Sequence, residues 1–90
     1  MLEVVVTGQF RKDMRRSLKQ GKALAALLTV CGYLINKKPL PEKFKDHPLI
    51  GDRIGRRDCH LQPDLVLIYR VEGNDLILER LGSHSELFKK

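Results

Sequence analysis

The three histidines of this 90-residue chain lie in its second half, each within a short polar stretch. His47 directly follows a lysine and an aspartate, His60 shortly precedes Asp64, and His84 shortly follows Arg80. Histidine exchanges a proton near neutral pH because its unperturbed pKa is about 6.5. Histidines beside arginine and aspartate in a basic protein indicate acid–base chemistry on an anion, and the anion we expect is RNA.

Cleavage of an RNA phosphodiester needs two proton transfers and a cation that stabilises the negative charge on the phosphoryl oxygens. The ribose 2′-OH loses a proton as it attacks phosphorus, and the 5′ oxygen gains one as it leaves; groups that titrate near neutrality contribute typically 10²–10⁴-fold each. We expect Arg80 to balance the charge on the phosphoryl oxygens with its planar set of donors. Asp64 is expected to orient a histidine, and Phe88 to stack on a base. None of these steps requires a metal.

The charge of the chain supports an anionic partner. Lys plus Arg number 17 and Asp plus Glu number 11, which gives a formal net charge of +6. The first expected helix is rich in bases, among them Arg15 and Arg16, and Asp13 is its only acid. We interpret this helix as a track for RNA phosphates or for an acidic protein partner. The alternative is a solvated helix face without counter-charges.

Each candidate also has a structural interpretation. Asp64 would only cap a turn, Arg80 would pair with Glu79 or Asp75 on the surface, and Phe88 would cover the core. The three histidines and a carboxylate could also bind zinc. They lack H-x₃₋₅-H spacing, however, and neither cysteine joins them, so we expect no metal and no other cofactor.

The elements that position these residues are expected in the order β-α-α-β-β-β. Residues 2–6 form a β-branched strand, and Thr7 caps a helix that buries Phe10, Met14 and Leu18 and ends at Gly21. A second helix ends near Asn36. Its expected buried side consists of Leu24, Leu27, Leu28, Cys31, Leu34 and Ile35.

After the helices, residues 37–53 contain three prolines and are expected to form an ordered loop. Residues 54–60, 64–71 and 75–81 are expected to form an antiparallel meander with turns at 61–63 and 72–74. Ser83 and Glu86 have capping-box spacing, which predicts a last helical turn. The fold class is α+β: a helical hairpin packed on a small, mostly antiparallel sheet, in one domain over residues 1–90.

This order brings the polar stretches together. The turn between the first two meander strands holds His60 and Asp64 at one end of the sheet. The third strand returns to that end, where Arg80, His84 and Phe88 follow. The loop with His47 precedes the meander and can reach the same place.

Other features of the chain place it in the cytoplasm. Cys31 and Cys59 have no C-x-x-C spacing, which favours reduced thiols. The N-terminus starts directly with a strand pattern and does not resemble a signal peptide. The uncharged stretch 23–35 is shorter than the roughly 20 residues that span a bilayer, so we expect no membrane association.

At these stretches the chain resembles the YafQ-type toxins of the RelE/ParE superfamily, from bacterial type II toxin–antitoxin systems. The resemblance covers nearly the whole chain, and several stretches in the right order are more specific than one alone. The residues that carry it are Lys45-Asp46-His47-Pro48-Leu49 with Gly51, Arg57-Asp58-Cys59-His60 to Pro63-Asp64-Leu65, Leu67-Ile68-Tyr69, and Arg80-Leu81-Gly82-Ser83-His84-Ser85-Glu86-Leu87-Phe88.

The resemblance implies a RelE-like fold and a ribosome-dependent endoribonuclease that cuts mRNA in the ribosomal A site and is silenced by a cognate antitoxin. The catalytic positions of the family fall on His47, His60, Asp64 and His84, with Arg80 binding the phosphate. Attack by the 2′-OH is expected without a metal, with His47 or His60 as base and His84 as acid. The residues expected to bind substrate are Phe88, Arg57, Lys45, Arg15 and Arg16.

Two observations qualify the resemblance. Some relatives carry Trp where this chain has Leu65, so stacking on that residue is lost and base preference or rate should differ. Other members of the superfamily inhibit DNA gyrase by binding it, which is the alternative function. Such a binder would not need histidines grouped with an arginine. A plain RNA-binding module is the third interpretation, but the expected sheet lacks paired aromatic residues for base stacking.

Overall fold

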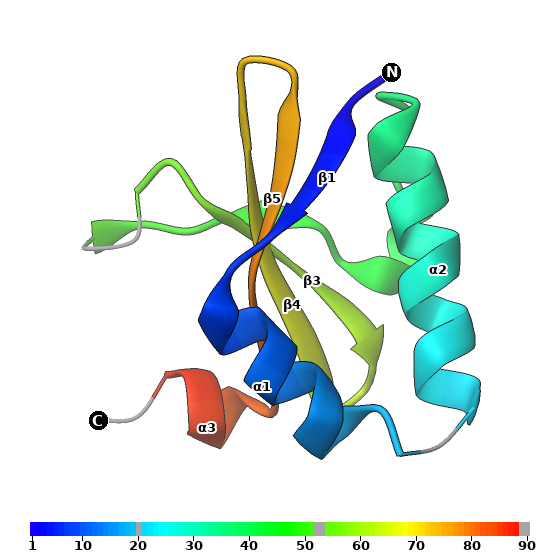
Figure 1. The fold of residues 1–90 in the computed structure, drawn as a ribbon, viewed down its shortest axis with the longest axis vertical. Coiled ribbons are helices and arrows are strands. Elements are labelled where there is room, and N and C mark those ends of the chain that lie inside the picture. Colours follow the sequence, from blue (N-terminus) through cyan, green and yellow to red (C-terminus); the bar gives the residue numbers. More distant parts are fainter. Residues whose placement is uncertain (20, 52–53, 89–90) are drawn as a thin grey trace.

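A five-stranded sheet with helices packed around it forms the fold, as a computed structural model of the chain shows (Figure 1). All residues are described except 20, 52–53 and 89–90. The elements are β1 (Glu3–Val6), α1 (Gly8–Ser17), α2 (Gly21–Ile35), a 3₁₀ turn η1 (Glu42–Phe44), β2 (His47–Pro48), β3 (Arg57–Gln62), β4 (Leu65–Glu72), β5 (Asp75–Gly82) and α3 (His84–Leu87). Within the described residues, no helix is long and apolar enough to cross a membrane.

The sheet has the strand order β1-β5-β4-β3-β2. β1 is parallel to β5, and every other neighbouring pair is antiparallel. The α+β class, the meander and the mostly antiparallel sheet expected from the sequence are therefore confirmed. The parallel pairing follows from topology, because the two helices carry the chain from β1 to the opposite edge before it returns through the meander.

Both faces of the central strand β4 are buried over residues 65–69, as the continuous apolar run there predicts. One face, with Leu67 and Tyr69, packs in the main core together with Leu27 of α2. The other face, with Val66 and Ile68, packs against Leu87 of α3. The last helical turn thus seals a second, smaller core, and its position over the sheet is fixed by an apolar contact.

α1 covers the end of β5 that β1 does not reach. Thr7 caps the helix as expected, since its hydroxyl accepts a hydrogen bond from Phe10 N–H and also donates to the Glu79 carbonyl. Further along, Asp13 accepts the Leu81 N–H at 2.9 Å. Side chains of α1 thereby occupy backbone groups that an adjacent strand would otherwise pair with, which closes this sheet edge.

Asp13 is fully buried and receives more donors than any other carboxylate in the described residues. Besides Leu81 N–H, they come from Gln9, from Arg16 at 3.0 Å and from Arg80 Nε at 2.8 Å. Burial raises the pKa of Asp13, but the bonds from Arg80, Leu81 and Gln9 outweigh it, so the pKa lies below its ordinary value. Asp13, the single acid of this basic helix, is therefore a buried structural group, whereas the interpretation of the exposed bases of α1 stays a prediction.

Several expected details of the helices differ in the structure. Gly21 begins α2, whereas α1 ends at Ser17. Leu24 and Leu28 of α2 are 43% and 63% exposed, and the buried stripe passes through Ala23, Leu27, Val30 and Leu34. An almost uniformly apolar helix gives no polar face from which the buried side can be identified, so the sequence pattern alone misplaced two leucines.

The segment before the meander is more structured than a loop. It contains η1 and the two-residue strand β2, although its residues 52 and 53 lie outside the described part. Ile54 is 77% exposed and precedes the strand that was expected to begin there. The turn after β3 lies at residues 63–64 rather than 61–63. The capping box of Ser83 and Glu86 is present as expected.

Replacement of Asp13 by asparagine should destabilise the fold by about 2–4 kcal/mol, because the arginine donors would face a neutral, partly donating amide in a buried site. Urea denaturation at pH 7 measures the loss. Since the folded pKa of Asp13 lies below 3.8, the contribution is present above that pH and is lost as the pH falls through the folded value. The exposed Asp75→Asn is the control, expected within about 0.5 kcal/mol of wild type.

Candidate active site

The register of the sheet brings the candidate residues onto the face covered by α3. Asp58 of β3 lies opposite Ile68 of β4, which lies opposite Arg80 of β5. On the other side, His47 of β2 lies opposite Asp58. Directly opposed residues point to the same face of a sheet. His60, two residues after Asp58, points there as well.

The three histidines converge around Asp58. His47 Nε2 lies 2.7 Å from Asp58 Oδ1, and one ligand-type atom from each of His47, Asp58 and His60 lies within 4.8 Å of the others. The rings of His60 and His84 have centroids 5.1 Å apart, and the His84 ring lies 5.5 Å from that of Phe88. The convergence of imidazoles from three segments, expected from the sequence, is present.

Asp58 is a buried carboxylate, 2% exposed, in the middle of this group. Burial raises its pKa, and the charges of His47, His60 and His84 oppose that shift without cancelling it. Its Oδ1 receives no aligned hydrogen bond within the described residues, despite the short distance to His47. Asp58 and His47 therefore form a close carboxylate–imidazole pair, and Asp58 Oδ1 keeps the capacity to accept a hydrogen bond or bind a ligand.

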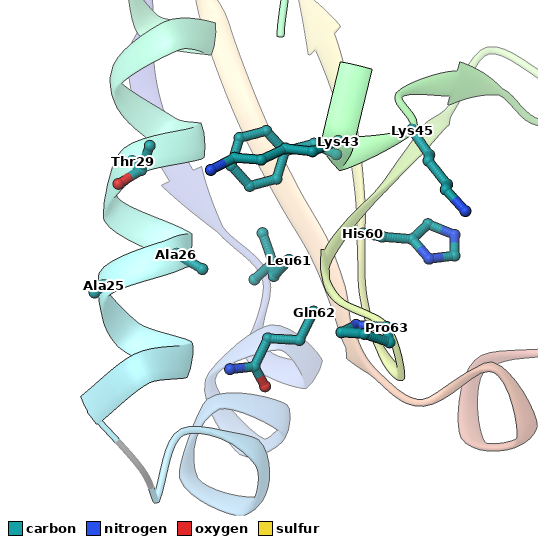
Figure 2. A pocket seen from close by; sticks show the side chains of 10 residues that line it. Ala25, Ala26, Thr29, Lys43, Lys45, His60, Leu61, Gln62 and Pro63 are labelled. Atoms are coloured by element: carbon teal, nitrogen blue, oxygen red, sulfur yellow. The ribbon is translucent and has the colours of Figure 1, made fainter. Parts of the chain in front are cut away.

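His60 is tuned toward its neutral form. Burial lowers its pKa, Asp58 raises it in part, and His84, Lys45 and His47 lower it further. Figure 2 shows the His60 ring and the Lys45 side chain on the same side of β3. A neutral imidazole with a free nitrogen lone pair is the form that a general base needs.

The segment that carries His47 is held by a separate polar cluster. Asp46 accepts hydrogen bonds from Arg57 at 3.2 and 3.3 Å and from the Tyr69 hydroxyl at 2.5 Å. The preceding Lys45 has a left-handed backbone, with φ of 49°, which turns the chain out of η1. Arg57, expected to bind substrate, is thus engaged in positioning the segment of His47.

Arg80 differs from the expectation in its partner. Its guanidinium is bound to Asp13 of α1, not to Glu79 or Asp75. Glu79 instead pairs with Arg56 and Arg70. The imidazoles consequently meet around a carboxylate, while Arg80 lies two strand positions away, about 10 Å by ordinary strand spacing.

Asp64 does not make the contact expected of it. It is exposed in the turn between β3 and β4, and its side chain makes no hydrogen bond or ion pair within the described residues. The carboxylate beside the imidazoles is Asp58. On α1, Arg15 is exposed, whereas Arg16 pairs with Asp13 and, at 3.0 Å, with Glu86 of α3.

Two functional or structural acids were missed by the sequence analysis, although simple periodicity indicates both. Asp58 and His60 are two residues apart in a strand, which places them on one face. Asp13 follows Phe10 by three residues in a helix, which places it beside the buried stripe. Asp64, beside the turn, was assigned to the histidines in place of Asp58, and Asp13 was noted only as the single acid of a basic helix.

The group of His47, Asp58 and His60 is also suited to a metal ion. Two imidazole nitrogens and a carboxylate oxygen are common ligands of zinc and copper, and Asp58 Oδ1 has capacity for one more partner. The ligand set considered from the sequence was the three histidines with a carboxylate, which lacks a recognisable spacing. In the structure the carboxylate is Asp58, and it groups with His47 and His60 without His84.

Comparison with known proteins assigns the family. Residues 2–89 match the family model described as the bacterial toxin of type II toxin–antitoxin system, YafQ. A curated relative, the mRNA interferase toxin YafQ of Escherichia coli K12, is 40% identical over 87 residues, covering 96% of this chain and 95% of that protein. The chain belongs to the YafQ family of bacterial toxins, which confirms the resemblance seen in the sequence.

Solved structures agree with this assignment. A copper-bound mutant toxin from Helicobacter pylori has a TM-score of 0.93 and 43% identity, over 98% of this chain and 100% of that one. A metal-bound toxin from the same species has a TM-score of 0.89 and 47% identity, with the same coverage. The toxin in an E. coli DinJ–YafQ complex has a TM-score of 0.86 and 39% identity, over 98% and 99% of the two chains.

The role of Asp58 is testable by its effect on the titration of His60. Because the Asp58 carboxylate raises the pKa of His60, Asp58→Asn should lower that pKa further. An NMR titration of the His60 ring protons, with a transition-metal chelator present, measures the change. Asp64→Asn is the matched control, and a shift of the same size in that variant would contradict the assignment of Asp58.

Proposed function

We propose that this protein is a ribosome-dependent endoribonuclease that cleaves mRNA by metal-independent acid–base catalysis. The observation that carries the proposal is the convergence of His47, His60 and His84 around the buried Asp58. The family supports the enzymatic class, since its E. coli K12 member is an mRNA interferase toxin. This support favours the nuclease over gyrase inhibition, the alternative left by the sequence.

His60 serves as the general base in this mechanism. It accepts the proton of the 2′-OH, because its lowered pKa keeps the imidazole neutral at physiological pH. Asp58 stabilises the imidazolium that forms, because its negative charge raises the pKa of His60. His84, exposed at the first turn of α3, donates a proton to the leaving 5′ oxygen, and its ring lies close enough to His60 for one phosphate to contact both.

Arg80 binds the phosphate in this scheme, and its side chain is held in place before the substrate binds. Asp13 fixes its Nε, so the remaining donors of the planar guanidinium are oriented before substrate arrives. His47 completes the site beside Asp58, with its Nε2 atom 2.7 Å from Asp58 Oδ1. A transition metal on His47 and His60 would occupy the nitrogen atoms that transfer protons, so metal binding and cleavage would compete.

Dependence on the ribosome fits the shape of the site. The histidines form an open surface with few groups to hold a free RNA strand, and His47 itself is 51% exposed. The exposed bases of α1, which include Arg11, Lys12 and Arg15, and the exposed Lys19 just after the helix offer contacts for ribosomal RNA phosphates. We infer that this surface docks the protein so that mRNA in the A site reaches the histidines.

A cognate antitoxin is the second partner. The DinJ–YafQ complex contains a toxin of nearly the same length and fold as this chain. The net charge of +6 favours an acidic segment of the antitoxin. The cytoplasm, where mRNA is translated, is the compartment in which these partners meet.

The catalytic assignment predicts that His84→Ala lowers mRNA cleavage by about 10²–10⁴-fold and abolishes growth arrest, because the leaving oxygen loses its proton donor. Induction in cells followed by mapping of mRNA 5′ ends measures the effect. Ser85→Ala, in the same helical turn, is the matched control. Cleavage by His84→Ala at the wild-type level would refute the assignment.

With purified ribosomes, a chelator of transition metals that spares Mg²⁺ should leave wild-type cleavage intact.

Docking through α1 predicts that Arg15→Gln weakens ribosome binding and lowers the slope of log affinity against log salt by about 1 for each lost phosphate contact. Arg15 is preferred to Arg16, whose ion pairs join α1 to α3. Co-sedimentation with ribosomes over a salt series measures the slope. Lys37→Gln, in an exposed position after α2, is the control. An unchanged slope for Arg15→Gln would exclude α1 as the docking surface.

A further inference from the structure

A hollow of about 470 Å³ lies between α2, η1 and the end of β3, next to the active site. Its lining includes Ala25 and Ala26 of α2, Lys43 of η1 and Gln62 of β3, while His60 and Lys45 border both the hollow and the histidine cluster. The volume falls within the usual range of small-molecule sites. The catalytic scheme above makes no use of this space.

The sequence explains why the hollow exists. Alanines on the facing side of α2 leave a gap that larger side chains would fill. β2 pairs only with residues 57 and 58, so the outer edge of β3 beyond Asp58 is not covered by β2. A register shift between His60 and Gln62 then places Leu61 out of the regular pairing with β4. Gln62 consequently lies opposite Leu65, on the face of α2, whereas His60 lies opposite Val66, on the face of α3.

The side chains divide along this edge. Figure 2 shows the His60 ring and Lys45 on one side of β3, and Lys43 and Gln62 reaching toward α2 on the other. Lys45 is close enough to His60 to lower its pKa. A chain that passes over the edge of β3 would therefore have its charged part near Lys45 and His60 and a side group in the hollow.

We propose that the hollow binds the base of a nucleotide adjacent to the cleaved phosphate, with the RNA backbone crossing the edge of β3 at Lys45. This inference rests on the proposed ribonuclease function and adds to it a site for base selection.

The chemistry of the lining fits a nucleotide. Ala26, Leu61 and Pro63 give apolar contacts for the faces of a base. The amide of Gln62 supplies both donors and an acceptor, which suits the edge of a base. Lys43 adds a positive charge for a neighbouring phosphate. Its Nζ lies 5.1 Å from the centroid of the Phe44 ring, which is buried, so selection here depends on shape and hydrogen bonds rather than on stacking.

The first test compares cleavage patterns. Ala25→Leu, which narrows the hollow, and Gln62→Ala, which removes the amide, should each change the frequency of the nucleotide on one side of the cut at least threefold in 5′-end mapping. The control Leu28→Phe enlarges an exposed side chain of the same helix and should retain the wild-type pattern. Identical nucleotide frequencies in all of these proteins would overturn the inference.

Failure of the ribonuclease proposal would look different. In that case wild type and His84→Ala would give the same 5′ ends, whatever the hollow contains. If instead Ala25→Leu weakens binding of the antitoxin and leaves the cleavage pattern unchanged, the hollow receives an antitoxin side chain and the inference is wrong.

A second test measures binding without cleavage. The His84→Ala protein is titrated with dinucleotides that carry a 2′-deoxyribose at the attacking position, and NMR follows the methyl group of Ala26 and the amide of Gln62. Shifts at these two groups that disappear in the Ala25→Leu, His84→Ala double variant support the inference. Replacement of either base by an abasic site identifies which base enters. Shifts confined to the histidines would overturn the inference.

Discussion

One buried carboxylate, Asp13, determines how the helical part of the fold meets the catalytic part. It binds a backbone N–H of β5, a side chain of α1 and the guanidinium of Arg80 at the same time. The first interaction closes an open sheet edge, and the last orients the cation expected to bind phosphate. Arg16 extends the connection to α3 through Glu86. The stability of the fold and the orientation of Arg80 thus depend on the same buried charge. The several donors around Asp13 offset the cost of removing that charge from water.

The electrostatics of the active face are organised around a second acid. Asp58 is buried and its pKa is raised, whereas Asp13 is buried and its pKa is lowered. The difference lies in their partners, since arginines surround one and titratable histidines surround the other. The arginine-bound acid is held ionised and structural. The acid among histidines has a proton close at hand, which suits a site that transfers protons.

The sequence predicted the fold class, the element order and the three-histidine cluster, because alternation, caps and turns are local signals that tertiary packing reinforced. It misassigned the acids. Asp64 is conspicuous beside a turn, but Asp58 has the contact, since residues two apart in a strand share a face. Leu24 was assigned to the core because α2 is apolar on nearly all sides. The pairing of Arg80 with Asp13, which joins distant parts of the chain, leaves no local trace.

The two-residue strand β2 makes His47 the least firmly held of the three histidines. Its backbone is held by two ladder positions and by a hydrogen bond from Leu49 N–H to the Arg56 carbonyl, and the neighbouring Asp46 is held through its side chain. His60, in contrast, lies within a six-residue strand. Segments with few hydrogen bonds open at a lower free energy than the core. Thermal inactivation of the protein should therefore begin before its tertiary structure melts, and should reverse on cooling as long as the sheet remains intact.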